Sequence, residues 1–111
     1  MSDRRIAAVI TDILGDRVII GEDELNLHAR KHFPNVPKDI VLEFLERILK
    51  DPVIIFEEIN IHLFHLFYRI DENRYVVAVI KRGKKGSFFT SIYPTGKTMR
   101  GKHKRFKRII I

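Results

Sequence analysis

Residues 60–94 read NIHLFHLFYRIDENRYVVAVIKRGKKGSFFTSIYP, and this stretch decides the class of fold. Its apolar and aromatic residues form three runs, which are separated by the short loops DEN and GKKG. A fourth run, VIIFEE at 53–58, precedes them. Because β-branched and aromatic residues favour strands and short loops join antiparallel neighbours, the pattern predicts a four-stranded antiparallel meander.

The two loops also predict how these strands align. A tight DEN turn would pair Arg69 with Tyr75, and a four-residue loop at 83–86 would pair Arg82 with Ser87. Since side chains alternate between faces, one face is then expected to carry a mixed set of residues. This set is Ile61, Leu63, His65, Phe67, Arg69, Tyr75, Val77, Val79, Lys81, Phe88, Thr90 and Ile92.

The first half of the chain predicts a strand pair followed by two helices. In RIAAVITDILGDRVIIG, residues 5–21, β-branched runs flank Gly15-Asp16, which suits a tight turn. GEDELNLHARKHFPN, residues 21–35, has acidic residues at its start, apolar residues at helical spacing and a proline stop. KDIVLEFLERILKDP, residues 38–52, has one apolar stripe. The expected fold class is therefore α+β: an N-terminal strand pair, two helices, then a four-stranded antiparallel sheet packed on the helices.

Length and composition favour one domain. The chain has 111 residues, of which 45% are hydrophobic, so it can form one compact core. We expect an α+β domain over residues 1–98 and a basic C-terminal tail over 99–111. The absence of cysteine excludes disulfides and thiolate metal sites. No apolar run reaches the about 20 residues that span a bilayer, and we expect a cytoplasmic protein without membrane contact.

The net positive charge of the chain comes entirely from its C-terminal third. Residues 1–72 hold 9 Lys and Arg against 14 Asp and Glu, whereas residues 73–111 hold 12 Lys and Arg and no acidic residue. Such a one-signed block is typical of proteins that bind phosphate groups, as in nucleic acids. It would equally serve an acidic membrane surface or an acidic partner protein, or act as a solvated tail.

The segment HARKH places His28 and His32 four residues apart on the first predicted helix. Histidines at this spacing bind zinc in peptidases with the pattern HExxH, but here the second position is Ala29. We therefore expect no metal and no other cofactor. Two interpretations remain open, namely proton transfer near neutral pH and a structural role at the edge of the core.

Two longer segments resemble a nuclease superfamily. TDILGDRVIIGEDELNLHARKHFPN, residues 11–35, combines D-x-x-G and a hydrophobic run with a helix that carries His-x-x-x-His-x-Pro. YRIDENRYVVAVIKRGKKGSFFTSIYPTGK, residues 68–97, has an arginine that ends one strand, a valine-rich strand, and a strand that ends in Thr-x-x-Tyr. Together they resemble the small phage-type members of the barnase, EndoU, colicin and RelE-like nucleases, the BECR fold.

The resemblance implies a metal-independent ribonuclease of the toxin type. It implies RNA as the substrate, whether transfer RNA, messenger RNA or ribosome-associated RNA, and a cognate antitoxin or immunity protein as a further partner. The positions that match the family pattern are His28 or His32, Arg69, Thr90 and Tyr93.

Elementary chemistry suggests a role for each of these residues. RNA carries its own nucleophile, the 2′-hydroxyl, so an enzyme must accept one proton, donate another and stabilise the pentavalent phosphate. We expect His28 or His32 to transfer a proton and Tyr93 to transfer the second or to stack on a base. Thr90 is expected to donate a hydrogen bond to phosphate. The expected phosphate contacts are Arg69, Lys81, Arg82, Lys84, Lys85 and Lys97.

Two other functions fit the same sequence. A non-catalytic nucleic-acid-binding module would use the basic residues to hold phosphates, and its histidines would be structural. A protein-interaction domain would use its basic tail to dock on an acidic partner.

Overall fold

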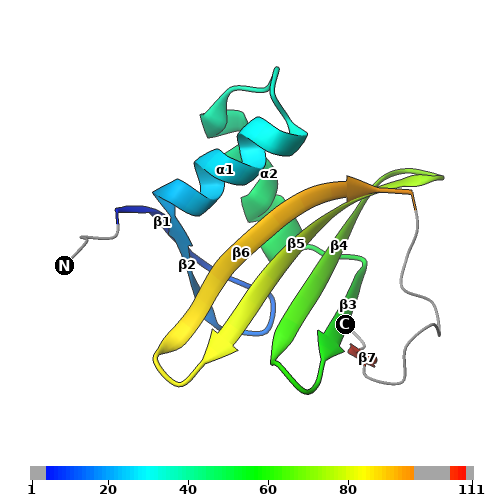
Figure 1. Cartoon of the computed structure of the whole chain (residues 1–111). Helices are drawn as coiled ribbons and strands as arrows, with labels where there is room; N and C mark the ends of the chain where they lie inside the picture. Colours follow the sequence, from blue (N-terminus) through cyan, green and yellow to red (C-terminus); the bar gives the residue numbers. More distant parts are fainter. Residues whose placement is uncertain (1–4, 97–105, 110–111) are drawn as a thin grey trace.

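The structure is a computed structural model that describes residues 5–96 and 106–109 (Figure 1). In chain order its elements are β1 (Ile6–Thr11), β2 (Arg17–Gly21), α1 (Glu22–His32), α2 (Lys38–Lys50), β3 (Ile54–Glu58), β4 (Leu63–Asp71), β5 (Arg74–Gly83), β6 (Gly86–Thr95) and β7 (Phe106–Ile109). The predicted strand pair, the two helices and the four-stranded meander are confirmed. Neither helix in this part of the chain is long and apolar enough to cross a bilayer.

The seven strands among the described residues belong to one sheet, in the order β1-β2-β6-β5-β4-β3-β7. Neighbouring strands are antiparallel except β2 and β6, which are parallel. The expectation of a separate four-stranded sheet was therefore wrong, because the N-terminal strand pair extends the meander through β6. An isolated strand pair is at best marginally stable in water. Joining the sheet lets Val18 and Ile20 become completely buried.

The last described strand lies within the segment that we expected to be a basic tail. β7 pairs with β3, so that Ile109 lies opposite Ile55 and the segment 106–109 becomes an edge of the sheet. The division of the chain at residue 98 stays a prediction.

Both helices cover the same face of the sheet (Figure 1). The apolar stripe of α2 contributes Val41, Leu45, Ile48 and Leu49 to the main core, and α1 contributes Leu25 and Ala29. The strands meet them with Phe64, Leu66, Val76, Ala78, Ile80, Phe89 and Ile92. This packing removes most of the apolar surface of the helices from water, which is the main source of stability.

The opposite face carries a second, smaller apolar cluster. Phe56, Phe67, Val77 and Val79 are buried there, and Tyr75 and Tyr93 pack against them. The rings of Phe56 and Phe67 meet edge to face, with centroids 5.8 Å apart. We call this side of the sheet the outer face.

The predicted register holds until a bulge in β6. Arg69 pairs with Tyr75 and Arg82 with Ser87, as expected. Between Val79 and Ile80 the register then shifts.

Thr90 is the additional residue at this bulge, because Ile80 pairs with Phe89 whereas Val79 pairs with Ser91. Our placement of Ile92 on the outer face was consequently wrong, since the bulge turns it into the main core. The hydroxyl of Thr90 donates a hydrogen bond of 2.9 Å to the carbonyl oxygen of Val79. The bulge is therefore stabilised by the side chain that creates it.

Candidate functional site

Helix α1 runs along the edge of β6 (Figure 1). β2 and β6 pair only at Val18 with Ser87 and at Ile19 with Phe88. β2 ends at Gly21 and α1 starts at the next residue, so the helix takes the place beside β6 that a longer β2 would have occupied. This geometry directs one side of α1 towards the second half of β6.

The first turn of α1 is acidic and its last turn is basic, which matches the direction of the helix dipole. Residues four apart lie on the same side of a helix, so His28 and His32 both face β6. Both histidines are half-buried.

The structure brings four of the predicted site residues together, and we call them the α1–β6 site: His28, His32, Thr90 and Tyr93. The imidazole rings of His28 and His32 are stacked, with centroids 6.3 Å apart and an angle of 3° between their planes. The ring of Tyr93 lies 6.3 Å from that of His32 at an angle of 52°. The backbone of Thr90 lies close enough to the imidazole of His28 to affect its pKa.

His28 is the more enclosed of the two histidines. Its ring meets that of Phe89 edge to face at 6.2 Å, and its Nδ1 atom is buried without a hydrogen-bond partner among the described residues. Burial lowers the pKa of His28 below its ordinary value of 6.5, and the positive charges of His32 and Lys31 lower it further. The backbone of Thr90 and the charge of Glu24 oppose this effect. His28 is therefore neutral at physiological pH.

Tyr93 is half-buried, and burial raises the pKa of its hydroxyl above the ordinary value of 10.0. The hydroxyl consequently keeps its proton at neutral pH and can donate a hydrogen bond or a proton. Its neighbour His32 can accept or donate through either ring nitrogen.

The role that we expected for the Thr90 hydroxyl does not match the structure. A hydroxyl has one proton to donate, and this proton is used in the bond to Val79. Thr90 therefore shapes the strand beside His28 and has no spare donor for a phosphate oxygen in this arrangement.

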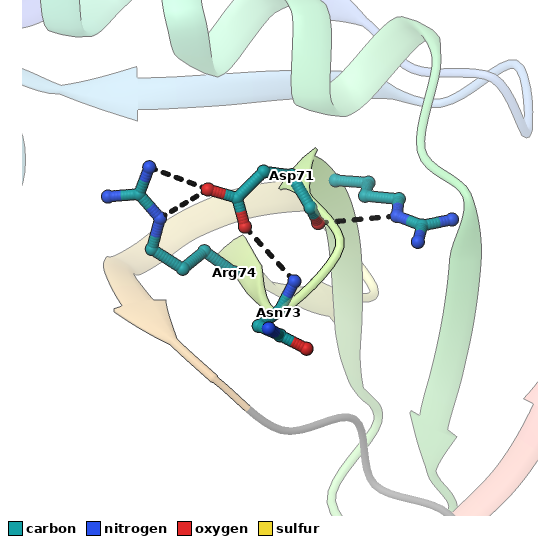
Figure 2. Close-up of polar contacts among 4 residues, drawn as sticks. Asp71, Asn73 and Arg74 are labelled. Carbon is teal, nitrogen blue, oxygen red and sulfur yellow. Dashed lines mark hydrogen bonds and ion pairs between the residues drawn. The ribbon is translucent and has the colours of Figure 1, made fainter.

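Arg69 lies near the end of β4, two residues before its last residue, Asp71. Figure 2 shows the polar contacts of Asp71, Asn73 and Arg74 at the turn between β4 and β5. The Nε atom of Arg69 donates a 3.3 Å hydrogen bond to the carbonyl oxygen of Asp71. The Asp71 carboxylate in turn accepts bonds from the Asn73 amide at 3.0 Å and from Nε of Arg74 at 2.6 Å. This network closes the turn and fixes the backbone that holds Arg69.

The sheet register places Arg69 two strands away from β6. Arg69 pairs with Tyr75, and Tyr75 pairs with Thr95 of β6, two residues beyond Tyr93. Arg69 and Tyr93 therefore lie at the same end of the outer face, but Arg69 is not part of the α1–β6 site.

The predicted phosphate contacts of the β5–β6 hairpin lie at the opposite end of the sheet. Lys81, Lys84 and Lys85 are exposed there. Arg82 forms an ion pair with Asp16, and its guanidinium lies 4.6 Å from the ring centroid of Phe64. Arg82 therefore ties this hairpin to the turn between β1 and β2. Lys97 lies outside the described residues.

His65 of β4 lies in a structural environment. Its Nε2 atom lies 3.5 Å from the carboxylate of Glu58, and both side chains are nearly buried. Burial lowers the pKa of His65, and Glu58 opposes this effect. Within the described ranges, no group of three His, Asp or Glu side chains is arranged to hold a metal ion.

Our reading of the sequence did not single out Glu24. It lies one helical turn before His28, and its charge acts on the imidazole. The spacing of Glu24, His28 and His32 by four residues each could have revealed that they share one side of α1.

Comparison with known proteins gave no match to a family model, to a curated protein or to a solved structure. Any statement about activity therefore depends on the site itself.

Proposed function

We propose that this protein is a metal-independent endoribonuclease that uses the α1–β6 site. One observation supports this proposal above all others: two stacked histidines from α1 lie beside a protonated tyrosine from β6. These residues are distant in the sequence and offer both the proton acceptor and the proton donor that cleavage of RNA requires.

In the proposed reaction, His32 accepts the proton of the 2′-hydroxyl while the 2′ oxygen attacks the adjacent phosphorus. The bond from phosphorus to the 5′ oxygen breaks, and Tyr93 or a protonated imidazole supplies the proton for that leaving oxygen. The products are a 2′,3′-cyclic phosphate and a free 5′-hydroxyl. His28 is a positioning residue in this proposal, because its ring is enclosed and stacks on that of His32.

Positive charges would hold the RNA on both sides of the site. Lys31 is exposed and close enough to lower the pKa of His28, so we propose that it is a cation that faces the reacting phosphate. We propose that Lys84, Lys85 and Arg69 contact phosphates farther along the strand, since their exposed side chains lie at the two ends of the sheet.

The proposal includes membership of the BECR nucleases and its usual consequences, a toxic activity in the cytoplasm and a cognate antitoxin or immunity protein. Two helices followed by an antiparallel meander support it at the level of fold. An acidic antitoxin would find an exposed basic surface at the β5–β6 hairpin.

The direct test is incubation with end-labelled RNA in EDTA. We expect fragments with 2′,3′-cyclic phosphate ends, and we expect His32→Ala and Tyr93→Phe to cleave at least about a hundredfold more slowly. His62→Asn is the matched control, because His62 is an exposed histidine with a positive φ of 55°, which asparagine tolerates. RNA that stays intact with the unmodified protein would disprove the enzyme proposal.

A second candidate is a nucleic-acid-binding module without catalysis. The enclosed ring of His28 favours it, since its edge-to-face contact with Phe89 gives this histidine a packing role beside β6. The same assay separates the two functions, because a binding module would retain RNA in a salt-sensitive manner and leave it uncut.

A further inference from the structure

A small cavity lies beside the α1–β6 site, where β2 and β6 stop pairing and α1 begins. Its volume is about 110 Å³. Its lining residues are Arg5, Ile6, Ile19, Gly21, Glu24 and Phe88. Pockets for drug-sized ligands measure about 300–1,000 Å³, so this cavity suits a single planar group and not a whole nucleotide.

The walls of the cavity combine an aromatic ring with a carboxylate. Ile6, Ile19 and Phe88 make it largely apolar, and Glu24 and Arg5 supply its charges. An aromatic ring offers a stacking surface to any nucleobase. A carboxylate can only accept hydrogen bonds, so it prefers a base edge that carries N–H donors.

Gly21 keeps the Glu24 carboxylate in the cavity. A Cβ atom at position 21 would collide with Oε1 of Glu24, so the carboxylate lies directly over the glycine. The φ of Gly21 is −73°, which any residue adopts, so this position needs a glycine for space and not for backbone conformation. A side chain there would push the carboxylate away without straining the helix start.

The cavity lies about one turn of α1 away from the proposed cleavage site. Glu24 precedes His28 by one turn, and Phe88 precedes Phe89 and Thr90, which contact His28. Four residues of an α-helix span about 6 Å, so a base in the cavity would leave its phosphate near the imidazoles.

We infer that this cavity binds the nucleobase next to the reacting phosphate and selects bases with an exocyclic amino group. Phe88 stacks on the base, and Glu24 accepts a hydrogen bond from the amino group. Uracil is disfavoured, because a carbonyl oxygen takes the position of the amino group and is repelled by the carboxylate. The inference rests on the proposed function for its substrate class, but it concerns binding and can be tested without cleavage.

The test compares cytidine 3′-monophosphate with uridine 3′-monophosphate, which differ at one exocyclic position. We would titrate the full chain with each and follow the backbone amide signals of Gly21 and Phe88 by NMR. Cytidine 3′-monophosphate should bind about tenfold more tightly and shift both signals. Equal affinity for the two ligands would overturn the inference. So would a titration that leaves the amide signals of Gly21 and Phe88 unchanged.

Variants identify the group that discriminates. Glu24→Gln keeps the shape of the side chain and should make the two affinities equal, and Gly21→Ala should do the same by displacing the carboxylate. Glu43→Gln, on the exposed side of α2, is the control and should retain the tenfold difference. Retained discrimination in Glu24→Gln would overturn the assignment of Glu24, and thermal unfolding of each variant shows that the fold is kept.

Cleavage of cytidylyl and uridylyl dinucleotides by the unmodified protein separates this inference from the proposed function. Cleavage without a preference between them, together with equal ligand binding, would reject base selection by the cavity and support the ribonuclease activity. Selective cytidine binding without cleavage would support the cavity and reject the ribonuclease.

Discussion

At the scale of single residues, burial sets the charge of the site. His28 and Tyr93 lie in different elements, yet both are shifted towards their neutral forms because their surroundings exclude water. A neutral imidazole and a protonated phenol are the forms that can accept and donate protons. The residue types alone give no such information, since His62 and His103 are also present in the chain.

The lowered pKa values of His28 and His65 predict how stability depends on pH. A histidine whose pKa is lower in the folded state binds fewer protons there than in the unfolded state. Its contribution is complete above the unfolded pKa of about 6.5 and is lost as the pH falls through the folded pKa. We therefore expect the free energy of unfolding, measured with urea, to fall as the pH decreases below about 6.5.

His28→Gln should weaken this pH dependence without removing it, because His65 still contributes. His62→Asn, at an exposed position, should leave the dependence unchanged. An identical slope in His28→Gln and in the unmodified protein would contradict the assignment.

At the scale of elements, the bulge in β6 decides which side chains reach the site. It shifts the register by one residue, so that Ile92 enters the main core while Tyr93 lies on the outer face near His32. Without the bulge, the alternation along β6 would be unbroken and these two side chains would exchange faces.

Thr90→Val tests the contribution of the bulge. The substitution keeps the shape of the side chain but removes its hydrogen bond to Val79, so we expect a loss of about 1 kcal/mol in the free energy of unfolding. Thr11→Val, at an exposed position of β1, should cost less than about 0.5 kcal/mol. Equal costs in urea denaturation would show that the Thr90 hydroxyl does not stabilise the bulge.

The helix α2 gives a second prediction at this scale. Leu45 is completely buried at the centre of its apolar stripe. Leu45→Ala should lower the free energy of unfolding by about 2–5 kcal/mol, because it leaves a cavity between helix and sheet. Glu46→Ala, at the next and exposed position, should cost much less in the same calorimetric or urea measurement. A small cost for Leu45→Ala would mean that α2 does not pack as described.

At the scale of the whole molecule, one mixed sheet joins the acidic and the basic parts of the chain. The proposed proton-transfer site combines a helix from the acidic part with a strand from the basic part. The exposed lysines of the β5–β6 hairpin belong to the basic part of the chain. They lie at the opposite end of the sheet from Arg69. In the proposed function, affinity for RNA should therefore come mainly from phosphate contacts.

Salt dependence measures these contacts. The logarithm of RNA affinity should fall linearly with the logarithm of salt concentration, and Lys84→Ala with Lys85→Ala should reduce the slope by about 1.4 for single-stranded RNA. The control is Lys38→Ala with Lys50→Ala, because these lysines belong to α2 and form ion pairs with Glu22 and Glu46. The prediction fails if both double variants give the same slope in a filter-binding titration.

The sequence by itself determined the elements from β1 to β6 and much of their pairing, but it did not predict β7. Hydrophobic periodicity predicted both helices and the meander, and short loops fixed the partners of Arg69 and Arg82. These features depend on neighbours within a few residues, so they can be read along the chain. Lys97 is outside the described residues, and its predicted contact with phosphate stays a prediction.

Only the tertiary structure decided how the strand pair joins the sheet and which residues share a site. The parallel contact of β2 with β6 has no local signal, because both strands must bury apolar side chains that many partners could cover. The bulge at Thr90 likewise depends on how β6 fits against β5. For the same reason, His32 meets Tyr93 only because α1 lies along β6. This contact distinguishes the histidine pair from two histidines on an ordinary exposed helix surface.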